Sequence, residues 1–174
     1  MNCKRKLDVR DIVFIGVLSS MCTIATTIKI PFGVGAMVHL GSAFLYTMGI
    51  IFGGVYAGLA GAIGSGFYDL LMGFSPYTLW SFLIKGIAGL IVGRVAKGLW
   101  PESTANTSKL FVRAFFACIL AAVWTLGGYI LAWWYVTGSL ATALGNIPSS
   151  LMTSGVGLSI ALLLGPKLRK LLRR

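Results

Sequence analysis

The chain alternates between long apolar runs and short breaks made of polar, glycine or proline residues. The apolar runs lie at about 11–28, 40–72, 77–96, 111–136 and 146–165. A helix needs about 20 apolar residues to cross a hydrocarbon core of about 30 Å, and four of the runs have roughly that length. The run 40–72 would reach about 50 Å as a single helix. We therefore predict that it folds back at Gly53 and Gly54 into two short helices.

The basic residues decide between five and six membrane-spanning helices. Six helices would leave thirteen of the fifteen basic residues on the same side of the membrane as both termini. Five helices would split this set, contrary to the tendency of Lys and Arg to stay on the cytoplasmic side. The sequence therefore predicts an all-α integral membrane protein, a compact bundle of six short transmembrane helices with both termini cytoplasmic. The thirteen residues are Lys4, Arg5, Lys6, Arg10, Arg94, Lys97, Lys109, Arg113, Lys167, Arg169, Lys170, Arg173 and Arg174.

Composition supports a multi-pass membrane protein. Hydrophobic residues make up 57% of the 174 residues, charged residues make up 11%, and the mean hydropathy is +0.88. A soluble domain of this size could not bury so much apolar surface in one core. The net charge of +11 comes from basic residues that flank the apolar runs, which is not the pattern of a nucleic-acid-binding surface. We interpret residues 1–174 as a single transmembrane domain.

The chain has too few polar groups for a catalytic centre. Its acidic residues are Asp8, Asp11, Asp69 and Glu102, and its one histidine is His39. Membrane enzymes usually gather several such groups, or metal ligands, at one depth. The ATP-binding motif G-x-x-x-x-G-K-[ST] is absent from the sequence. We expect no enzyme activity, no metal and no cofactor, so any energy from ATP would come from a partner.

Two charged residues lie inside apolar runs. Asp69 falls about one turn from the predicted outer end of its helix, and Lys85 falls about 13 Å along the next helix, counted from Pro76. A charge at this depth costs about 3 kcal/mol or more, so it should face the bundle interior and find a partner. One interpretation is an ion pair that fixes the register of two antiparallel helices. The other is a polar floor under a ligand pocket that opens outward.

Aromatic residues gather near the predicted outer side, among them Tyr77, Trp80 and Trp133. Tyr and Trp form belts at both membrane interfaces, which is the simpler interpretation of each one. As a group opposite Asp69 and Lys85, they would also suit a flat heteroaromatic ligand that stacks on a ring. This reasoning gives the following candidate substrate-binding residues: His39, Asp69, Tyr77, Trp80, Ser81, Lys85, Trp133 and Asn146.

Small residues recur at helical spacing in two of the predicted helices. Gly54, Gly58, Ala62 and Gly66 lie four residues apart, and Gly89 and Gly93 repeat the pattern further along the chain. Such ridges allow helix backbones to approach closely in lipid. We interpret them as internal packing surfaces.

Two segments resemble a known family of membrane proteins. They are "VHLGSAFLYTMGIIFGGVYAGLAGAIGSGFYDLLMG" at 38–73 and "IKGIAGLIVG" at 84–93. Their His-Leu-Gly, glycine-rich turn, Asp69 and Lys85–Gly86 follow the order and spacing found in substrate-binding S components of energy-coupling factor (ECF) vitamin transporters. The resemblance is greatest to the branch that carries hydroxymethylpyrimidine, pyridoxine and related small rings.

The resemblance implies a division of labour among subunits. An S component binds its vitamin tightly from outside, and a transmembrane scaffold subunit with two ATPases drives release inward. It implies docking on the scaffold through small residues of the first helix, here Gly16 and Ser20 in place of the family's alanines. It also adds Ser150 and Thr153 to the candidate substrate-binding residues, at places where relatives often have Asn and Gln.

The expected function is that of a high-affinity substrate-binding subunit of an ECF importer, with a pyridoxine- or hydroxymethylpyrimidine-like ring as ligand. Riboflavin, pantothenate or another vitamin is the alternative within this class. A self-contained proton-coupled carrier or channel that uses Asp69 and Lys85 is the alternative of another class, although proton relays usually need more titratable groups. A structural assembly factor that binds only partner helices is a third.

Overall fold

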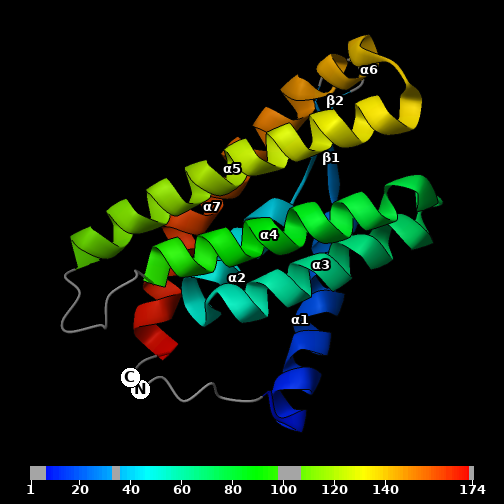
Figure 1. Ribbon diagram of the computed structural model, residues 1–174. Helices are drawn as coiled ribbons and strands as arrows, with labels where there is room; N and C mark the ends of the chain where they lie inside the picture. Colours follow the sequence, from blue (N-terminus) through cyan, green and yellow to red (C-terminus); the bar gives the residue numbers. More distant parts are fainter. Residues whose placement is uncertain (1–6, 33–35, 98–106, 173–174) are drawn as a thin grey trace.

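The computed structural model describes residues 7–32, 36–97 and 107–172. Within these residues the chain forms seven α-helices, a 3-10 turn and a two-stranded hairpin, and six of the helices are long (Figure 1). The elements in chain order are α1 (Val9–Thr27), β1 (Lys29–Phe32), β2 (Ala36–His39), α2 (Gly41–Phe52), α3 (Gly54–Leu71), η1 (Ser75–Tyr77), α4 (Thr78–Lys97), α5 (Thr107–Thr137), α6 (Leu140–Gly145) and α7 (Ile147–Leu172).

The sequence predicts six short transmembrane helices, and six of the described helices have 12 residues or more. Four helical segments of the described chain are long and apolar enough to cross a membrane, namely Val9–Thr27, Ser75–Ala96, Leu110–Thr137 and Leu140–Arg169. The helix α2 is apolar but has only 12 residues, and α3 has 18 residues but is rich in glycine and carries Asp69. These two are the helices into which the long run 40–72 divides.

The division falls at Gly53, as predicted. This residue ends α2 and caps the start of α3, and its φ of 96° lies in the region that glycine enters without steric cost. The chain can therefore change direction there within a single residue.

The first helix starts at a capping box and is held at that end by aromatic contacts. The Asp8 side chain accepts from the backbone N–H of Val9 at 2.8 Å, and the Asp11 carboxylate accepts from the backbone N–H of Asp8 at 3.0 Å. The hydroxyl of Tyr56, on α3, donates to Asp11 at 2.7 Å. The ring of Phe14 lies edge-on to that of Tyr56, with centroids 5.8 Å apart. Helix α1 is thus fixed to the start of α3.

Two predictions about segment type and length are wrong. The segment 29–39, predicted as a loop, contains an antiparallel hairpin in which Lys29 pairs with His39, so the fold is not purely helical. Helices α5 and α7 are longer than expected, with 31 and 26 residues. At 1.5 Å per residue α5 is about 47 Å long, which requires tilting or projection beyond the hydrocarbon. Helix α7 continues past Pro166 because the residues after this proline are good helix formers.

The interior is built from small residues, and α3 and α4 form its closest contact. A Cβ added to Gly89 would lie 2.5 Å from the carbonyl oxygen of Ala57, and one added to Gly58 would lie 3.0 Å from that of Gly86. The predicted ridges at Gly54, Gly58, Gly89 and Gly93 are therefore internal packing surfaces. We call this contact between α3 and α4 the glycine seam. It brings the outer parts of both helices, including Asp69 and Lys85, to one side of a shared cavity.

A candidate ligand-binding cavity

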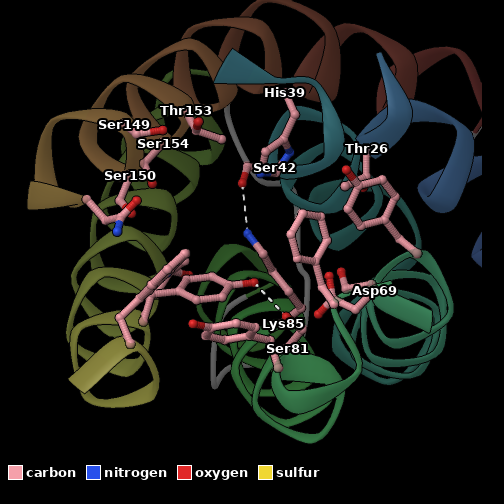
Figure 2. A pocket seen from close by; sticks show the side chains of 18 of the residues that line it. Thr26, His39, Ser42, Asp69, Ser81, Lys85, Ser149, Ser150, Thr153 and Ser154 are labelled. Atoms are coloured by element: carbon pink, nitrogen blue, oxygen red, sulfur yellow. Dashed lines mark hydrogen bonds between the residues drawn. The ribbon is translucent and has the colours of Figure 1, made fainter. Parts of the chain in front are cut away.

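A cavity of about 230 Å³ lies toward the end of the bundle that carries the hairpin, η1 and α6. We call this end the hairpin end; it lies opposite the start of α1 and the end of α7 (Figure 1). Figure 2 shows polar side chains from several helices converging on the cavity. Its lining residues are Thr26, Lys29, His39, Ser42, Ser65, Tyr68, Asp69, Phe74, Tyr77, Ser81, Lys85, Thr125, Tyr129, Trp133, Asn146, Ser149, Ser150, Thr153 and Ser154.

Lys85 is the most deeply buried charge of this cavity. Its side chain is 5% exposed, and its ammonium donates to the hydroxyl of Ser42 at 3.0 Å. The ammonium also lies 5.5 Å from the centre of the Tyr129 ring, within the range of a cation–π contact. Both of these contact partners are neutral, and the carboxylate of Asp69 acts on the ammonium through its charge without a hydrogen bond.

Asp69 lines the same cavity but is not paired with Lys85. Its side chain is 8% exposed, and its Oδ2 atom is enclosed without a hydrogen-bond partner. The ammonium of Lys85 points toward Ser42 and away from Asp69 (Figure 2). The structure therefore does not show the ion pair that was one interpretation of these two residues.

Aromatic rings form one wall of the cavity. The rings of Tyr77 and Trp133 lie 4.7 Å apart at an angle of 41°, and the hydroxyls of Ser81 and Tyr129 are hydrogen-bonded at 3.2 Å. Trp80 does not line the cavity; its ring instead contacts Tyr135, with centroids 5.8 Å apart. The wall that could stack a flat ligand is thus made by Tyr77, Trp133 and Tyr129.

The hairpin supplies two basic groups to the cavity. Because Lys29 pairs with His39 across the two strands, both side chains come to its mouth. The Lys29 ammonium lies 5.4 Å from the centre of the Tyr68 ring and 5.9 Å from that of Phe74. Burial, and then the charges of Lys85 and Lys29, lower the pKa of His39 to about 3. His39 is therefore neutral at physiological pH, and its enclosed Nδ1 has no hydrogen-bond partner.

Another part of the lining is a row of short polar side chains that begins at Asn146, between α6 and α7, and continues into the start of α7. Asn146, Ser149, Ser150, Thr153 and Ser154 recur at intervals of three or four residues, so they share one helix face. Asn146 Nδ2 donates to the Thr142 backbone carbonyl at 3.1 Å. This row was only partly predicted, because Ser149 and Ser154 were missed although their spacing gives the signal.

Nine of the ten candidate substrate-binding residues line the cavity, and Trp80 is the exception. That they bind a ligand stays a prediction. Besides Ser149 and Ser154, the lining residues absent from the candidate list are Lys29, in the unexpected hairpin, Phe74, before η1, and several hydroxyl or phenol groups inside apolar helices. The latter are Thr26, Ser42, Ser65, Tyr68, Thr125 and Tyr129. A polar residue within an apolar run is the signal that they offered.

The two candidate docking residues lie elsewhere, on the outer face of α1. A Cβ on Gly16 would have nothing within 4 Å, and Ser20 is exposed, with its hydroxyl donating to the Gly16 carbonyl at 3.0 Å. Val13 and Val17 beside them are 62% and 52% exposed. No other part of the described chain covers Gly16.

No group of three or more His, Cys, Asp or Glu residues within 7–32, 36–97 and 107–172 could hold a metal ion. The lining of the cavity is instead a set of hydroxyls, rings and three charged side chains, those of Lys29, Asp69 and Lys85. Such a site can orient a small organic molecule by hydrogen bonds and stacking.

Comparison with known proteins gives a family match over nearly the whole chain. A family model described as "ECF-type riboflavin transporter, S component" matches residues 6–170. A UPF0397 protein of Exiguobacterium sp. is 32% identical over 104 residues, which cover 59% of this chain and 55% of that protein. An uncharacterized protein of Pyrococcus woesei is 29% identical over 118 residues, which cover 68% of each chain. A UPF0397 protein of Lactiplantibacillus plantarum is 31% identical over 113 residues, with coverage of 63% and 60%. The matched part spans between about half and two thirds of the length of these relatives.

Proposed function

This chain belongs to the family of ECF-type riboflavin transporter S components, and on that premise we propose that it captures a flat heteroaromatic vitamin in the cavity at the hairpin end. As a component of an ECF transporter, it is a multi-pass protein of the plasma membrane that acts in transport and not in catalysis. The transporter class predicted from the sequence agrees with this family.

Riboflavin is the leading ligand. The family description supports it better than the pyridoxine or hydroxymethylpyrimidine ring expected from the sequence. The cavity has two kinds of wall that suit a flat ring with a polyhydroxylated chain. One is formed by the rings of Tyr77 and Trp133, and the other by the row of polar side chains from Asn146 to Ser154. Its volume of about 230 Å³ lies just below the usual range for ligand pockets, so we expect the ring to be enclosed and the chain to reach the mouth.

The observation that carries this proposal is the position of Lys85. A cation deep in a membrane protein is costly and usually marks a functional site. Here the ammonium faces a cavity with an aromatic wall, and its hydrogen-bond and ring partners among the described residues, Ser42 and Tyr129, are neutral. A residue that served only to fix helix register would be expected to pair with Asp69.

For the orientation, we propose that the hairpin end faces outward and that both termini are cytoplasmic. Among the described residues, Arg10, Arg94, Arg113 and Lys167 are exposed and lie near the helix ends opposite the hairpin end, as the positive-inside rule requires. The cavity would then receive ligand from outside. Partners would be a transmembrane scaffold subunit and two ATPases, with docking through Gly16 and Ser20.

Direct binding to the purified protein tests the proposal. Isothermal titration in detergent with riboflavin should give one site per chain and a nanomolar-range Kd. Riboflavin at 100 times the Kd should stabilise the folded state by about 2.7 kcal/mol. Pyridoxine, hydroxymethylpyrimidine and pantothenate serve as comparison ligands in the same titration. If riboflavin failed to bind and one of the other vitamins bound, the assignment of riboflavin would be wrong, but the proposal that a vitamin binds in this cavity would stand.

The alternative of a self-contained proton-coupled carrier is distinguished by an uptake experiment. We expect proteoliposomes that contain this chain alone to take up no vitamin in a pH gradient, since Asp69 and Lys85 are not joined as a relay. Uptake without any ATPase would contradict the proposed role as a binding subunit.

A further inference from the structure

We propose that the ligand presents an amide-type edge, a carbonyl beside an N–H, to the floor of the cavity. The carbonyl accepts a hydrogen bond from the Lys85 ammonium, and the N–H donates to the Asp69 carboxylate. This inference rests on the proposed function, because it names the chemical class of the molecule bound in the same cavity.

Lys85 requires an acceptor. An ammonium has three N–H donors and no acceptor, and among the described residues only Ser42 accepts a hydrogen bond from it. Tyr129 faces the charge with its ring, which does not replace a hydrogen-bonded oxygen. A charge buried to this degree is stable only when its donors are satisfied. A ligand oxygen would satisfy a donor that Ser42 leaves free.

Asp69 requires a donor. A carboxylate only accepts hydrogen bonds, and Oδ2 of Asp69 is enclosed without a partner. Buried polar atoms of native proteins nearly always have a partner, and an unsatisfied one needs an explanation. An N–H of the ligand is such a partner.

The side chain that requires an acceptor and the side chain that requires a donor line the same cavity and belong to neighbouring helices. Asp69 is on α3 and Lys85 is on α4, the two helices joined by the glycine seam, and both side chains line the cavity floor (Figure 2). A molecule that carries an acceptor beside a donor on one edge can satisfy both. The cation–π contact with Tyr129 places the ammonium beside the aromatic wall, so this adjacent pair belongs on the edge of a flat ring.

The charge of the cavity sets a second requirement, that the ring carries no positive charge. Two lysines, Lys29 and Lys85, and a single carboxylate, Asp69, are among the described lining residues, while His39 is neutral. The lining thus carries one more positive charge than negative, with Lys85 and Asp69 buried and Lys29 exposed. A cationic ring would therefore be repelled, whereas a neutral lactam or imide is accepted.

Riboflavin carries such an edge at N3, which lies between two carbonyls, and its N3-methyl derivative lacks the donor. In isothermal titrations we expect methylation to weaken binding to the unaltered protein by about 30-fold or more, because the Asp69 carboxylate loses its donor. In Asp69→Ala the penalty of methylation should fall below about threefold, since the acceptor is gone. Asp8→Ala, at the exposed start of α1, makes the same substitution outside the cavity and should keep the full penalty.

A second pair of variants tests Lys85 in the same way. Lys85→Met keeps the length of the side chain without its charge and should weaken riboflavin binding by about 30-fold or more. Lys167→Met makes the same change at an exposed position of α7 and should leave binding within twofold. The unaltered protein alone already decides the central question, so a variant that fails to fold does not remove the test.

The outcomes separate the two proposals. Equal affinity of the unaltered protein for riboflavin and its N3-methyl derivative would overturn this inference and leave the proposed function standing. An undiminished methylation penalty in Asp69→Ala would overturn the assignment of the N–H to Asp69. Failure of both flavins to bind would overturn the proposed riboflavin-type ligand and this inference with it.

Discussion

Small residues with a four-residue spacing occur in two regions of the molecule and have opposite surroundings. In the glycine seam, a Cβ on Gly58 or Gly89 would lie within 3.0 Å of backbone atoms of the facing helix. On α1, nothing lies within 4 Å of a Cβ on Gly16, and Ser20 is exposed. The same sequence pattern therefore occurs where two helices of this chain pack together and where a helix face has no neighbour in the described chain. A short side chain shows that a close approach is possible, but only the structure shows whether the partner belongs to the same chain.

The largest effect on folding should come from a larger side chain in the glycine seam. Gly89→Val would place a branched side chain against the backbone of Ala57 and Gly58, and two helix backbones cannot separate without disturbing Asp69 and Lys85. We expect little folded protein, measured as the loss of the monodisperse peak in size-exclusion chromatography in detergent. Gly127→Val, at an open glycine of α5 with nothing within 4 Å of its Cβ, is the matched control. Normal folding of Gly89→Val would show that the seam is not tightly packed.

A larger side chain at Gly16, on the exposed face of α1, should leave folding unchanged and reduce transport. Gly16→Leu meets no neighbour within the chain, so folding and riboflavin affinity should be unchanged. Uptake in proteoliposomes that contain the scaffold and ATPases should fall by about tenfold or more, because a large side chain prevents the close approach of another helix. Gly127→Leu provides the control on a different helix and should transport normally. Full transport by Gly16→Leu would show that the scaffold docks on another surface of the protein.

The parts of the fold that sequence reasoning predicts are those set by length and charge. The run 40–72 is too long for one span, and its paired glycines supply the break, so the division at Gly53 follows from simple geometry. Lys85 is predicted to face the interior because lipid would not solvate it, and it does line the cavity. Both arguments depend on the membrane, which makes misplaced charges and overlong helices expensive.

The parts that were missed depend on rotation and on contacts distant in sequence. Trp80 and Tyr77 differ by three residues, yet only Tyr77 lines the cavity. Tyr77 belongs to η1 and Trp80 to α4, which begins at Thr78, and the apolar pattern did not predict this change of helix type. The hairpin that brings Lys29 opposite His39 was read as a loop, since four-residue strands give little periodicity. Ser42 was missed because its role arises only when α2 meets α4 at Lys85.

The hairpin end also differs from the seam in its response to acid. The seam contacts are made by Gly, Ala and Leu and do not titrate, whereas His39 has a pKa of about 3 in the folded protein against an ordinary value of 6.5. The unfolded chain therefore takes up the proton first, so the contribution of His39 to stability is complete above pH 6.5 and declines as the pH falls toward 3. Thermal melts between pH 8 and 5 should show a smaller loss of melting temperature in His39→Asn than in the unaltered protein. Equal slopes would mean that His39 is protonated without cost.

The smallest effect concerns the contact that holds the start of α1, since nothing in the described chain lies within 4 Å of a Cβ on Gly16. The hydroxyl of Tyr56 donates to Asp11 at 2.7 Å, and the Tyr56 ring contacts Phe14, so this polar and aromatic contact, and not the Gly16 face, attaches the end of α1 to α3. Tyr56→Phe keeps the ring and removes the hydroxyl, and should lower the free energy of unfolding by about 1 kcal/mol. Tyr135→Phe, at a residue that is 78% exposed, should change it by less than about 0.5 kcal/mol. Denaturant titration of both variants in detergent measures the difference. If the two variants were equally stable, α1 would be held by its apolar contacts alone, and the open face of Gly16 would be free to move with the helix as a unit.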